Sequence, residues 1–127
     1  MCTVIVGYKL FPHVPLVVAA NRDELLDRPS EPPRLWTGAP FILAPVDLQR
    51  SGTWIGVNNR GVFAALTNRV DVVSVQGMGS RGVFVTRALL EKSAHAAMLE
   101  ITALDARDYN GFNLIIGDEA SGLYVIR

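Results

Sequence analysis

Short apolar runs separated by tight turns occupy both ends of this chain, and two segments of helical periodicity lie between them. The clearest turn is Asn58-Asn59-Arg60-Gly61, which joins apolar runs at residues 53–57 and 62–67. Asn and Gly tolerate the positive φ angles that a tight hairpin requires. Because strands come first, helices follow and strands return, the pattern predicts an α+β fold with antiparallel sheets rather than alternating βαβ units.

Further strands are predicted where β-branched and apolar residues cluster between turn residues. They lie at residues 3–9, 16–20, 41–44, 114–116 and 123–126. The first two are joined across Pro12 and Pro15 and form a predicted hairpin, and the last two form another. Four prolines between residues 28 and 40 instead predict a stretch that largely lacks regular structure.

Two helices are predicted between the strands. Ser80 is placed to cap a helix over residues 81–92, and a second helix is expected over residues 94–103. Residues 77–82 match G-x-G-x-x-G, but a dinucleotide site needs a strand before this motif and a parallel strand after the helix. The pattern favours a flexible loop that leads into the helix and can at most bind an anion there.

Length and charge exclude several classes of protein. The 127 residues suit one domain spanning residues 1–127, and 12 Lys and Arg residues balance 12 Asp and Glu residues. A net charge of zero gives no general attraction for nucleic acid or anionic lipid. With no membrane-length apolar run and no signal-peptide pattern, we expect a cytoplasmic protein without stable membrane insertion. One cysteine and two distant histidines predict neither a disulfide framework nor a metal site.

Cys2 is the only cysteine, and its position gives it a chemistry of its own. Removal of Met1, which a small second residue permits, would leave Cys2 with a free α-amine. That amine can take the thiol proton directly or through a water, so one residue would supply both nucleophile and base. The alternative is a small buried hydrophobic residue at the start of the first strand.

Polar residues at other strand ends are the remaining candidates. Pairing of the first two strands would place Arg22 or Asp23 near Cys2, where a cation favours a thiolate and a carboxylate can hold an α-ammonium. The alternative is a solvated charged turn. Asn68, at the end of a later strand, can donate to a developing oxyanion, although Asn caps turns more often. Asn113 follows Asn110-Gly111 and is also typical of a turn.

Together these residues resemble a known family. The initial Met-Cys, then LVVAANRDE, SGTWIGVNNRGVFAALTN, SRG before a helix and YNGFNLIIGD are similar in order to the NRDE family, also called the transport and Golgi organisation family. That family is similar to N-terminal nucleophile hydrolases and, more distantly, to the choloylglycine hydrolase and penicillin acylase group. The resemblance implies an αββα sandwich of two antiparallel sheets with helices outside.

The resemblance also implies a role for each matching residue. Cys2 would be the nucleophile, Arg22 would lie against the thiol, and Asp23 would hold the α-amine, a role for which Glu24 could compete. Asn68 would donate to the oxyanion. The substrate is then expected to contact the remaining side chains of the motifs, which are Asn21, Glu24, Trp54 and Asn113.

The implied activity is a hydrolase or acyltransferase that acts on a non-peptide amide or a related acyl bond of a small molecule, without a cofactor. An alternative comes from the same resemblance, because some family members are linked to haem handling and to lipid or membrane traffic. On that alternative the domain carries haem or a hydrophobic ligand near Trp36 and Trp54 without catalysis, and Cys2 could ligate haem iron as a thiolate.

Composition adds an expectation about the surface. Apolar residues make up 50% of the chain and charged residues only 19%, against about 25% charged in a typical domain. The hydrolase pattern also contains a later Asn and Arg, and this sequence ends at Arg127 before either. We therefore expect a C-terminally truncated sandwich with an apolar face or sheet edge, covered by the missing half or by a second copy.

Overall fold

A computed structural model describes residues 2–69 and 71–127 of the chain. The expected removal of Met1 concerns a residue outside these two stretches. The strands are β1 Thr3–Phe11, β2 Val14–Asn21, β3 Ser30–Trp36, β4 Ile42–Asp47, β5 Ile55–Asn58, β6 Phe63–Asn68, β7 Phe112–Asp118 and β8 Gly122–Ile126. The helices are α1 Gly82–Leu90 and α2 Ala94–Thr102.

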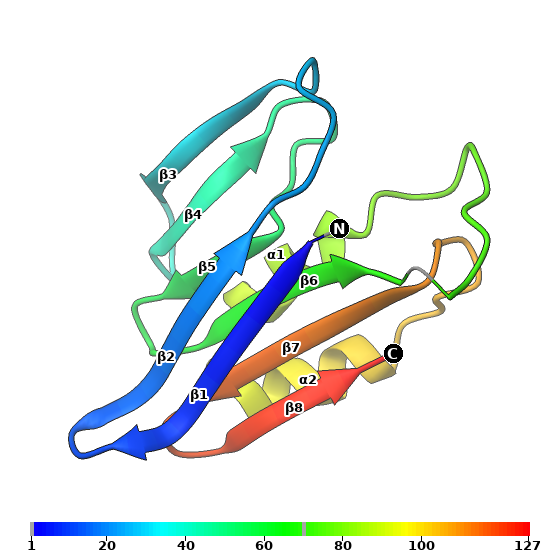
Figure 1. The fold of residues 1–127 in the computed structure, drawn as a ribbon. Helices are drawn as coiled ribbons and strands as arrows, with labels where there is room; N and C mark the ends of the chain where they lie inside the picture. The colour runs from blue at the N-terminus through cyan, green and yellow to red at the C-terminus, as the bar shows by residue number, and fades with distance from the viewer. Residues whose placement is uncertain (1, 70) are drawn as a thin grey trace.

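The elements form three layers (Figure 1). β1 and β2 pair as a two-stranded antiparallel sheet, and β3 to β8 follow one another in a six-stranded antiparallel sheet. The β1–β2 hairpin lies on one face of the larger sheet against β6 and β7, and α1 and α2 cover the other face. The α+β class and the antiparallel sheets are confirmed, whereas the complete αββα sandwich of an N-terminal nucleophile hydrolase stays a prediction.

The predicted hairpins are confirmed, and β1, β2, β7 and β8 are longer than expected, whereas β5 is shorter. β1 and β2 pair from Thr3 opposite Asn21 to Phe11 opposite Val14. β5 and β6 are joined by the predicted turn, in which Gly61 takes a φ of +85° that a residue with a side chain rarely adopts. The register of the β1–β2 hairpin and that of the β5–β6 hairpin determine which residues lie beside one another at the ends of these strands.

The core lies between the six-stranded sheet and the two helices. Side chains alternate across each strand, so one face of β4, β6 and β7 turns apolar residues toward the helices. The largest fully buried apolar side chains of this core are Phe84, Leu89, Leu114, Ile116, Val62 and Val85. Phe84 packs against the rings of Tyr109 and Phe112, with centroids 4.7 and 4.6 Å away, and this contact holds α1 on the sheet.

The prediction that prolines prevent regular structure between residues 28 and 40 is wrong. β3 runs through Pro32 and Pro33 as an edge strand of the six-stranded sheet. Its register shifts between Glu31 and Arg34, so the prolines occupy an irregular segment of the pairing. Proline removes one backbone donor, and an edge strand at a bulge can dispense with it.

The predicted cap of α1 is also wrong, although the helix itself is confirmed. The N-cap residue is Arg81, which makes no side-chain capping bond, and Ser80 lies one position too early. Ser93 caps α2 instead, because its hydroxyl accepts the Ala96 backbone N–H at 3.1 Å. The first turn of α1 is therefore left without a side-chain acceptor from its own N-cap.

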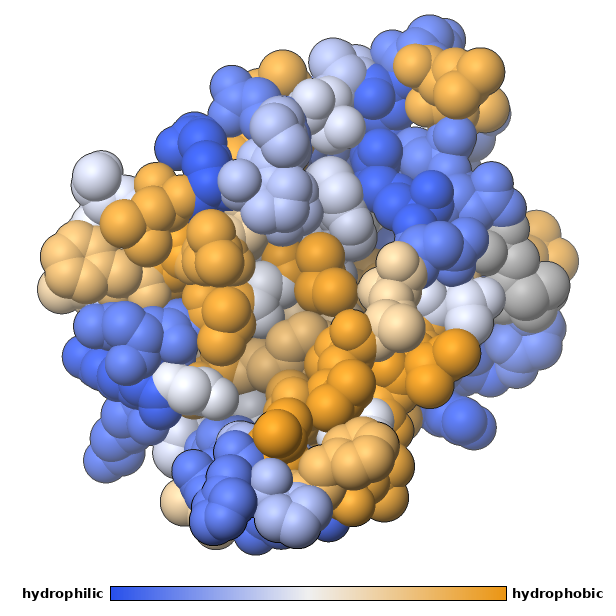
Figure 2. Space-filling view, turned by 60° about the vertical axis from the view of Figure 1, so that its left-hand side comes forward, coloured by the Kyte–Doolittle hydropathy of each residue, from blue (hydrophilic) through white to orange (hydrophobic). Residues whose placement is uncertain are grey.

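Apolar side chains remain exposed around the β1–β2 hairpin, as the composition predicted. Ile5 is 65% exposed and Val17 is 42% exposed, and Phe11 near the hairpin tip is 58% exposed. Figure 2 shows apolar surface around a hollow on the side of the molecule that carries β2 to β5. In the described part of the chain, β3 and β8 are the two edges of the larger sheet. What covers this surface stays a prediction.

Candidate functional site

The open end of the β1–β2 hairpin brings Cys2 beside the residues that follow β2. Thr3 lies opposite Asn21 in the register, and its backbone N–H donates to the side-chain Oδ1 of Asn21 at 2.7 Å. Cys2 directly precedes Thr3, and Asp23 lies two residues after Asn21, so Cys2 and Asp23 lie beside each other at this end of the hairpin. The expectation from hairpin pairing that Asp23 could lie near Cys2 is confirmed as geometry.

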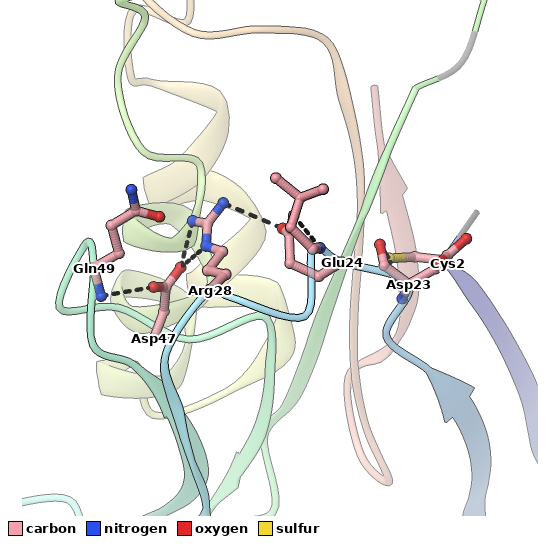
Figure 3. Close-up of polar contacts among 7 residues, drawn as sticks. Cys2, Asp23, Glu24, Arg28, Asp47 and Gln49 are labelled. Carbon is pink, nitrogen blue, oxygen red and sulfur yellow. Dashed lines mark hydrogen bonds and ion pairs between the residues drawn. The ribbon is translucent and has the colours of Figure 1, made fainter.

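The sulfur of Cys2 is oriented by the backbone of Asp23 (Figure 3). The Asp23 backbone N–H donates to the Cys2 sulfur at 3.3 Å, and the thiol donates to the Asp23 carbonyl oxygen at 3.6 Å. Cys2 is half-buried and stands apart from the buried core cluster. The alternative of a buried small hydrophobic residue therefore does not describe its position, and its sulfur has a defined direction.

An open cavity of about 470 Å³ adjoins Cys2. The predicted site residues that line it are Cys2, Asn21, Arg22, Glu24, Trp54 and Asn68. They come from the position just before β1, the end of β2 and the segment after it, the segment before β5, and the end of β6. Strand ends that are far apart in the sequence thus converge on one hollow.

Two predicted site residues do not line this cavity. Asp23 reaches the site through its backbone contacts with Cys2. Asn113 lies on β7, where its side-chain Nδ2 donates to the Thr67 hydroxyl at 3.1 Å. Asn113 instead lines a neighbouring shallow hollow that it shares with Cys2 and Asn68.

Arg22 is directed toward Trp54. Its guanidinium carbon lies 4.2 Å from the centroid of the Trp54 ring, within the range of a cation–π contact. The resemblance implied that Arg22 lies against the thiol, but the described residues show no hydrogen bond between Arg22 and the Cys2 sulfur. The contact instead holds Arg22 and Trp54 together on the cavity wall.

Arg28 connects two carboxylates at the cavity and was not predicted as a site residue (Figure 3). Its Nη2 and Nε donate to Oδ2 of Asp47 at 2.5 and 3.2 Å, and its Nη1 donates to Glu24 Oε2 at 3.2 Å. Oδ1 of Asp47 also accepts the Gln49 backbone N–H at 3.0 Å. The network ties the segment after β2 to the end of β4, and it occupies the Glu24 carboxylate that was a candidate for holding the α-amine.

The acid of this network titrates below its ordinary range. Burial acts to raise the pKa of Asp47, but the hydrogen bonds from Arg28 and from the Gln49 backbone outweigh it and hold the pKa below 3.8. A carboxylate with a lowered folded-state pKa stabilises the fold above its unfolded-state pKa. That contribution is lost as the pH falls through the folded-state pKa.

We expect Asp47→Asn to lower the free energy of unfolding by about 1–3 kcal/mol at pH 7, because Arg28 loses a charged acceptor. The variant should also lose less stability than the wild type when the pH is lowered below 3.8. Urea unfolding at neutral and acidic pH measures both effects. Asp105→Asn is the matched control, since the pair of Asp105 with Arg107 is fully on the surface and should matter little. Equal acid sensitivity of wild type and Asp47→Asn would contradict the prediction.

A loop before α1 forms another wall of the cavity. The Asn110 side chain accepts the Val75 N–H at 2.7 Å and donates to the Val75 carbonyl at 2.8 Å. The Gly79 N–H donates to the Asp108 carbonyl at 2.8 Å. This loop contains the G-x-G-x-x-G match, and no described strand leads into it, so it lacks the context of a dinucleotide site.

Arg81, at the end of this loop, was also missed as a site residue. It lines the cavity, and its Nη1 donates to the Gly111 carbonyl at 3.1 Å. The sequence offered one signal, because Arg81 is the cation of the loop that was expected to be able to bind an anion. Asp47 and Arg28 offered none, since 19 residues separate them.

The described residues contain no group of three His, Cys, Asp or Glu side chains that could hold a metal ion. His13 lies in the β1–β2 turn, and Nδ1 of His95 lies 3.3 Å from the Tyr124 hydroxyl. No helix in the described stretches has the length and apolar character needed to cross a membrane.

Comparison with known proteins gives a family for the whole chain. Residues 1–127 match the model of the family described as Transport and Golgi organisation 2. The chain is 37% identical over 106 residues to the human Transport and Golgi organization protein 2 homolog and 34% identical over 106 residues to the mouse Transport and Golgi organization 2 homolog. Each match covers 81% of this chain but only 38% of the relative. An uncharacterized protein of Saccharomyces cerevisiae is 33% identical over 75 residues, which is 54% of this chain and 23% of that protein.

Proposed function

The chain belongs to the Transport and Golgi organisation 2 family, and from that premise we propose that its site performs N-terminal cysteine acyl chemistry. The reaction would be hydrolysis or transfer of an acyl group from a non-peptide amide or a related acyl bond of a small molecule. The observation that carries the proposal is the Cys2 sulfur, oriented by the Asp23 backbone at a cavity that Asn68 also lines. The names of the relatives state no reaction, so activity and substrate are proposals for this chain.

The first step would form a thioester on Cys2. After removal of Met1, the α-amine of Cys2 takes the thiol proton, and the sulfur attacks the carbonyl carbon of the substrate. The side-chain amide of Asn68 donates a hydrogen bond to the resulting oxyanion. The carbon–nitrogen bond then breaks, and the leaving nitrogen takes the proton from the α-ammonium, which the Asp23 carboxylate would hold.

The second step would regenerate the thiol. The α-amine takes a proton from a water molecule, whose oxygen attacks the thioester carbonyl. The carbon–sulfur bond breaks, the acid leaves, and the sulfur takes its proton back from the α-ammonium. An acceptor amine or alcohol in the place of water would give acyl transfer with the same balance of protons.

Incubation with p-nitrophenyl acetate tests the nucleophile directly. We expect rapid release of p-nitrophenol and a chain that carries one acetyl group, which peptide mass spectrometry places on Cys2. The same spectra of the untreated chain report whether Met1 has been removed. Acetylation confined to other side chains, with Cys2 unmodified, would overturn the proposal.

A blocked N-terminus tests the base separately. A chain extended at its N-terminus by an uncleaved Gly-Ser pair keeps the Cys2 thiol but converts its amine into an amide. We expect alkylation of Cys2 by iodoacetamide to continue, while turnover of p-nitrophenyl acetate falls about 100-fold because the intramolecular base is gone. Unchanged turnover of the extended chain would exclude the α-amine as the base.

The carrier alternative is less well supported by the arrangement of the side chains. Trp36 and Trp54 do not share one interior, because the Trp36 indole donates to the Ala44 carbonyl and packs on the core, whereas Trp54 lines the cavity. Cys2 offers a thiolate for haem iron, but polar and charged side chains dominate the described lining, where a macrocycle needs apolar walls. Haem titration checks this: a Soret shift that depends on Cys2 would favour the carrier.

A further inference from the structure

Positive charge is concentrated at the cavity beside Cys2. The charged residues in its lining are four arginines and two carboxylates: Arg22, Arg28, Arg50, Arg81, Glu24 and Asp47. The chain as a whole has a net charge of zero. The lining therefore has an excess of two positive charges that the whole chain does not have. This local charge favours the binding of an anion.

Arg81 differs from the other arginines of the lining in its contacts and burial, and of these Arg50 is exposed to solvent. Arg28 is paired with both carboxylates of the lining, and Arg22 lies over Trp54. Arg81 is half-buried, and the structure pairs its guanidinium with the neutral carbonyl of Gly111. A guanidinium has five N–H donors. Among the described residues, no carboxylate forms an ion pair with Arg81, and both carboxylates of the lining are paired with Arg28.

An unpaired cation in this place costs free energy. Burial lowers the pKa of Arg81, repulsion by Arg28 lowers it further, and attraction to Glu24 and Cys2 offsets these effects only in part. A charge withdrawn from water is unfavourable until a counter-charge or hydrogen bonds replace its hydration. A bound anion would supply both to Arg81.

The fold also holds Arg81 in place. The residue after it, Gly82, begins α1 against the segment that carries Trp54, and a Cβ atom there would lie 2.9 Å from the Thr53 carbonyl oxygen. The close approach and the Gly111 contact keep Arg81 on the cavity wall, within electrostatic reach of Cys2. A planar guanidinium presents parallel N–H groups that match the two oxygens of a carboxylate or a phosphate.

We propose that the acyl compound processed at Cys2 carries an anionic group, a carboxylate or a phosphate, and that Arg81 binds this group. The inference rests on the proposed function, because it names the substrate class for the same site. Binding of the anionic end would fix the compound in the cavity and present its acyl carbon to the Cys2 sulfur, which lowers the entropic part of the barrier.

Alkylation of Cys2 tests the anion site without any turnover. The chain has one cysteine, so the rates with anionic iodoacetate and neutral iodoacetamide can be compared at a single thiol. We expect Arg81→Gln to lower the iodoacetate-to-iodoacetamide rate ratio about threefold or more, and Arg81→Lys, which keeps the charge, to lower it less. Arg60→Gln, in the exposed β5–β6 turn, is the matched control and should leave the ratio unchanged. An unchanged ratio in Arg81→Gln, or an equal fall in Arg60→Gln, overturns the inference. Should Arg81→Gln fail to fold by circular dichroism, Arg81→Lys decides. A ratio below that of the wild type, because an ammonium lacks the parallel N–H groups of a guanidinium, supports the inference, and an unchanged ratio overturns it.

Acylation and protection then define the anion. We expect mono-p-nitrophenyl succinate to acylate Cys2 faster than p-nitrophenyl butyrate, with Arg81→Gln slowing only the succinate ester, by about tenfold. No acylation by either ester, with the alkylation ratio still dependent on Arg81, would overturn the proposed function and retain the anion site.

Protection of Cys2 from iodoacetamide by butyrate indicates a carboxylate site, and protection by inorganic phosphate indicates a phosphate site. Absence of protection by both anions overturns the site.

Discussion

Replacement of Cys2 by alanine is expected to lower site-dependent turnover of p-nitrophenyl acetate at least about 100-fold, to the background of surface amines and hydroxide. Alanine removes the one thiol of the chain and leaves the cavity residues Asn68 and Arg81 unchanged. Those side chains can bind or polarise an ester, but neither forms a covalent intermediate. Burst kinetics followed by peptide mass spectrometry measure the loss of both p-nitrophenol release and the acetylated peptide.

The fold of the alanine variant should be intact. Cys2 is half-buried, lies outside the core cluster and makes its side-chain contacts with the backbone of Asp23. We therefore expect the free energy of unfolding to change by less than about 1 kcal/mol. Cys2→Ser keeps the size and a hydrogen-bonding group but is a weaker nucleophile, so a small residual turnover is expected. Turnover at the wild-type rate in either variant would refute the nucleophilic role of Cys2.

The part of the site that the sequence predicted depends on local pairing. Because residues 3–9 and 16–20 read as one hairpin, the position of Cys2 just before the first strand implied contact with residues just after the second. The observed pairing of Thr3 with Asn21 and the contact of Cys2 with Asp23 confirm that reasoning. Hairpin register is a short-range property, so turn chemistry and strand patterns were enough to predict it.

The part that the sequence did not predict depends on contacts between distant segments. Arg28 meets Asp47 only because β3, a strand that the prolines argued against, pairs with β4 and brings the end of β4 back to the segment after β2. Arg81 enters the cavity because its loop is held by residues 108–111. The contact of Arg28 with Asp47 leaves no local pattern. The one signal for Arg81 was its place in a loop expected to be able to bind an anion, and an arginine in a loop is most often a solvated surface residue.

The apolar composition predicted that apolar side chains would be exposed, but it did not identify what covers them. Ile5 and Val17 are exposed on the hairpin as expected, and the aligned part of the chain accounts for only 38% of the human and mouse relatives. A second copy of the chain would cover such a face without further sequence, and additional strands or helices would cover it equally well. Analytical ultracentrifugation of this chain distinguishes these two possibilities, because only covering by a second copy gives a dimer.

Replacement of Asn58 by alanine is expected to lower the free energy of unfolding by about 2–4 kcal/mol. The Asn58 side chain is 5% exposed and joins the β5–β6 turn to the end of α1. Its Nδ2 donates to the Leu89 and Glu91 carbonyls at 2.9 Å each, and its Oδ1 accepts the backbone N–H groups of Arg60 and Val62 at 2.9 Å each. Alanine leaves these four groups without this partner, and an unsatisfied buried group costs about 1–3 kcal/mol. Urea unfolding followed by circular dichroism measures the loss.

Two matched variants separate the hydrogen bonds of Asn58 from its position in the turn. Asn59→Ala removes the next side chain, which is exposed, and should change the free energy of unfolding by no more than about 0.5 kcal/mol. Asn58→Asp keeps the acceptor but turns a carboxylate toward two carbonyl oxygens, so at pH 7 it should destabilise at least as much as alanine. When the pH is lowered, this carboxyl gains a proton and one donor, so Asn58→Asp should regain stability relative to Asn58→Ala. If Asn58→Asp matched the wild type at pH 7, donation to the end of α1 would not be what stabilises this part of the fold.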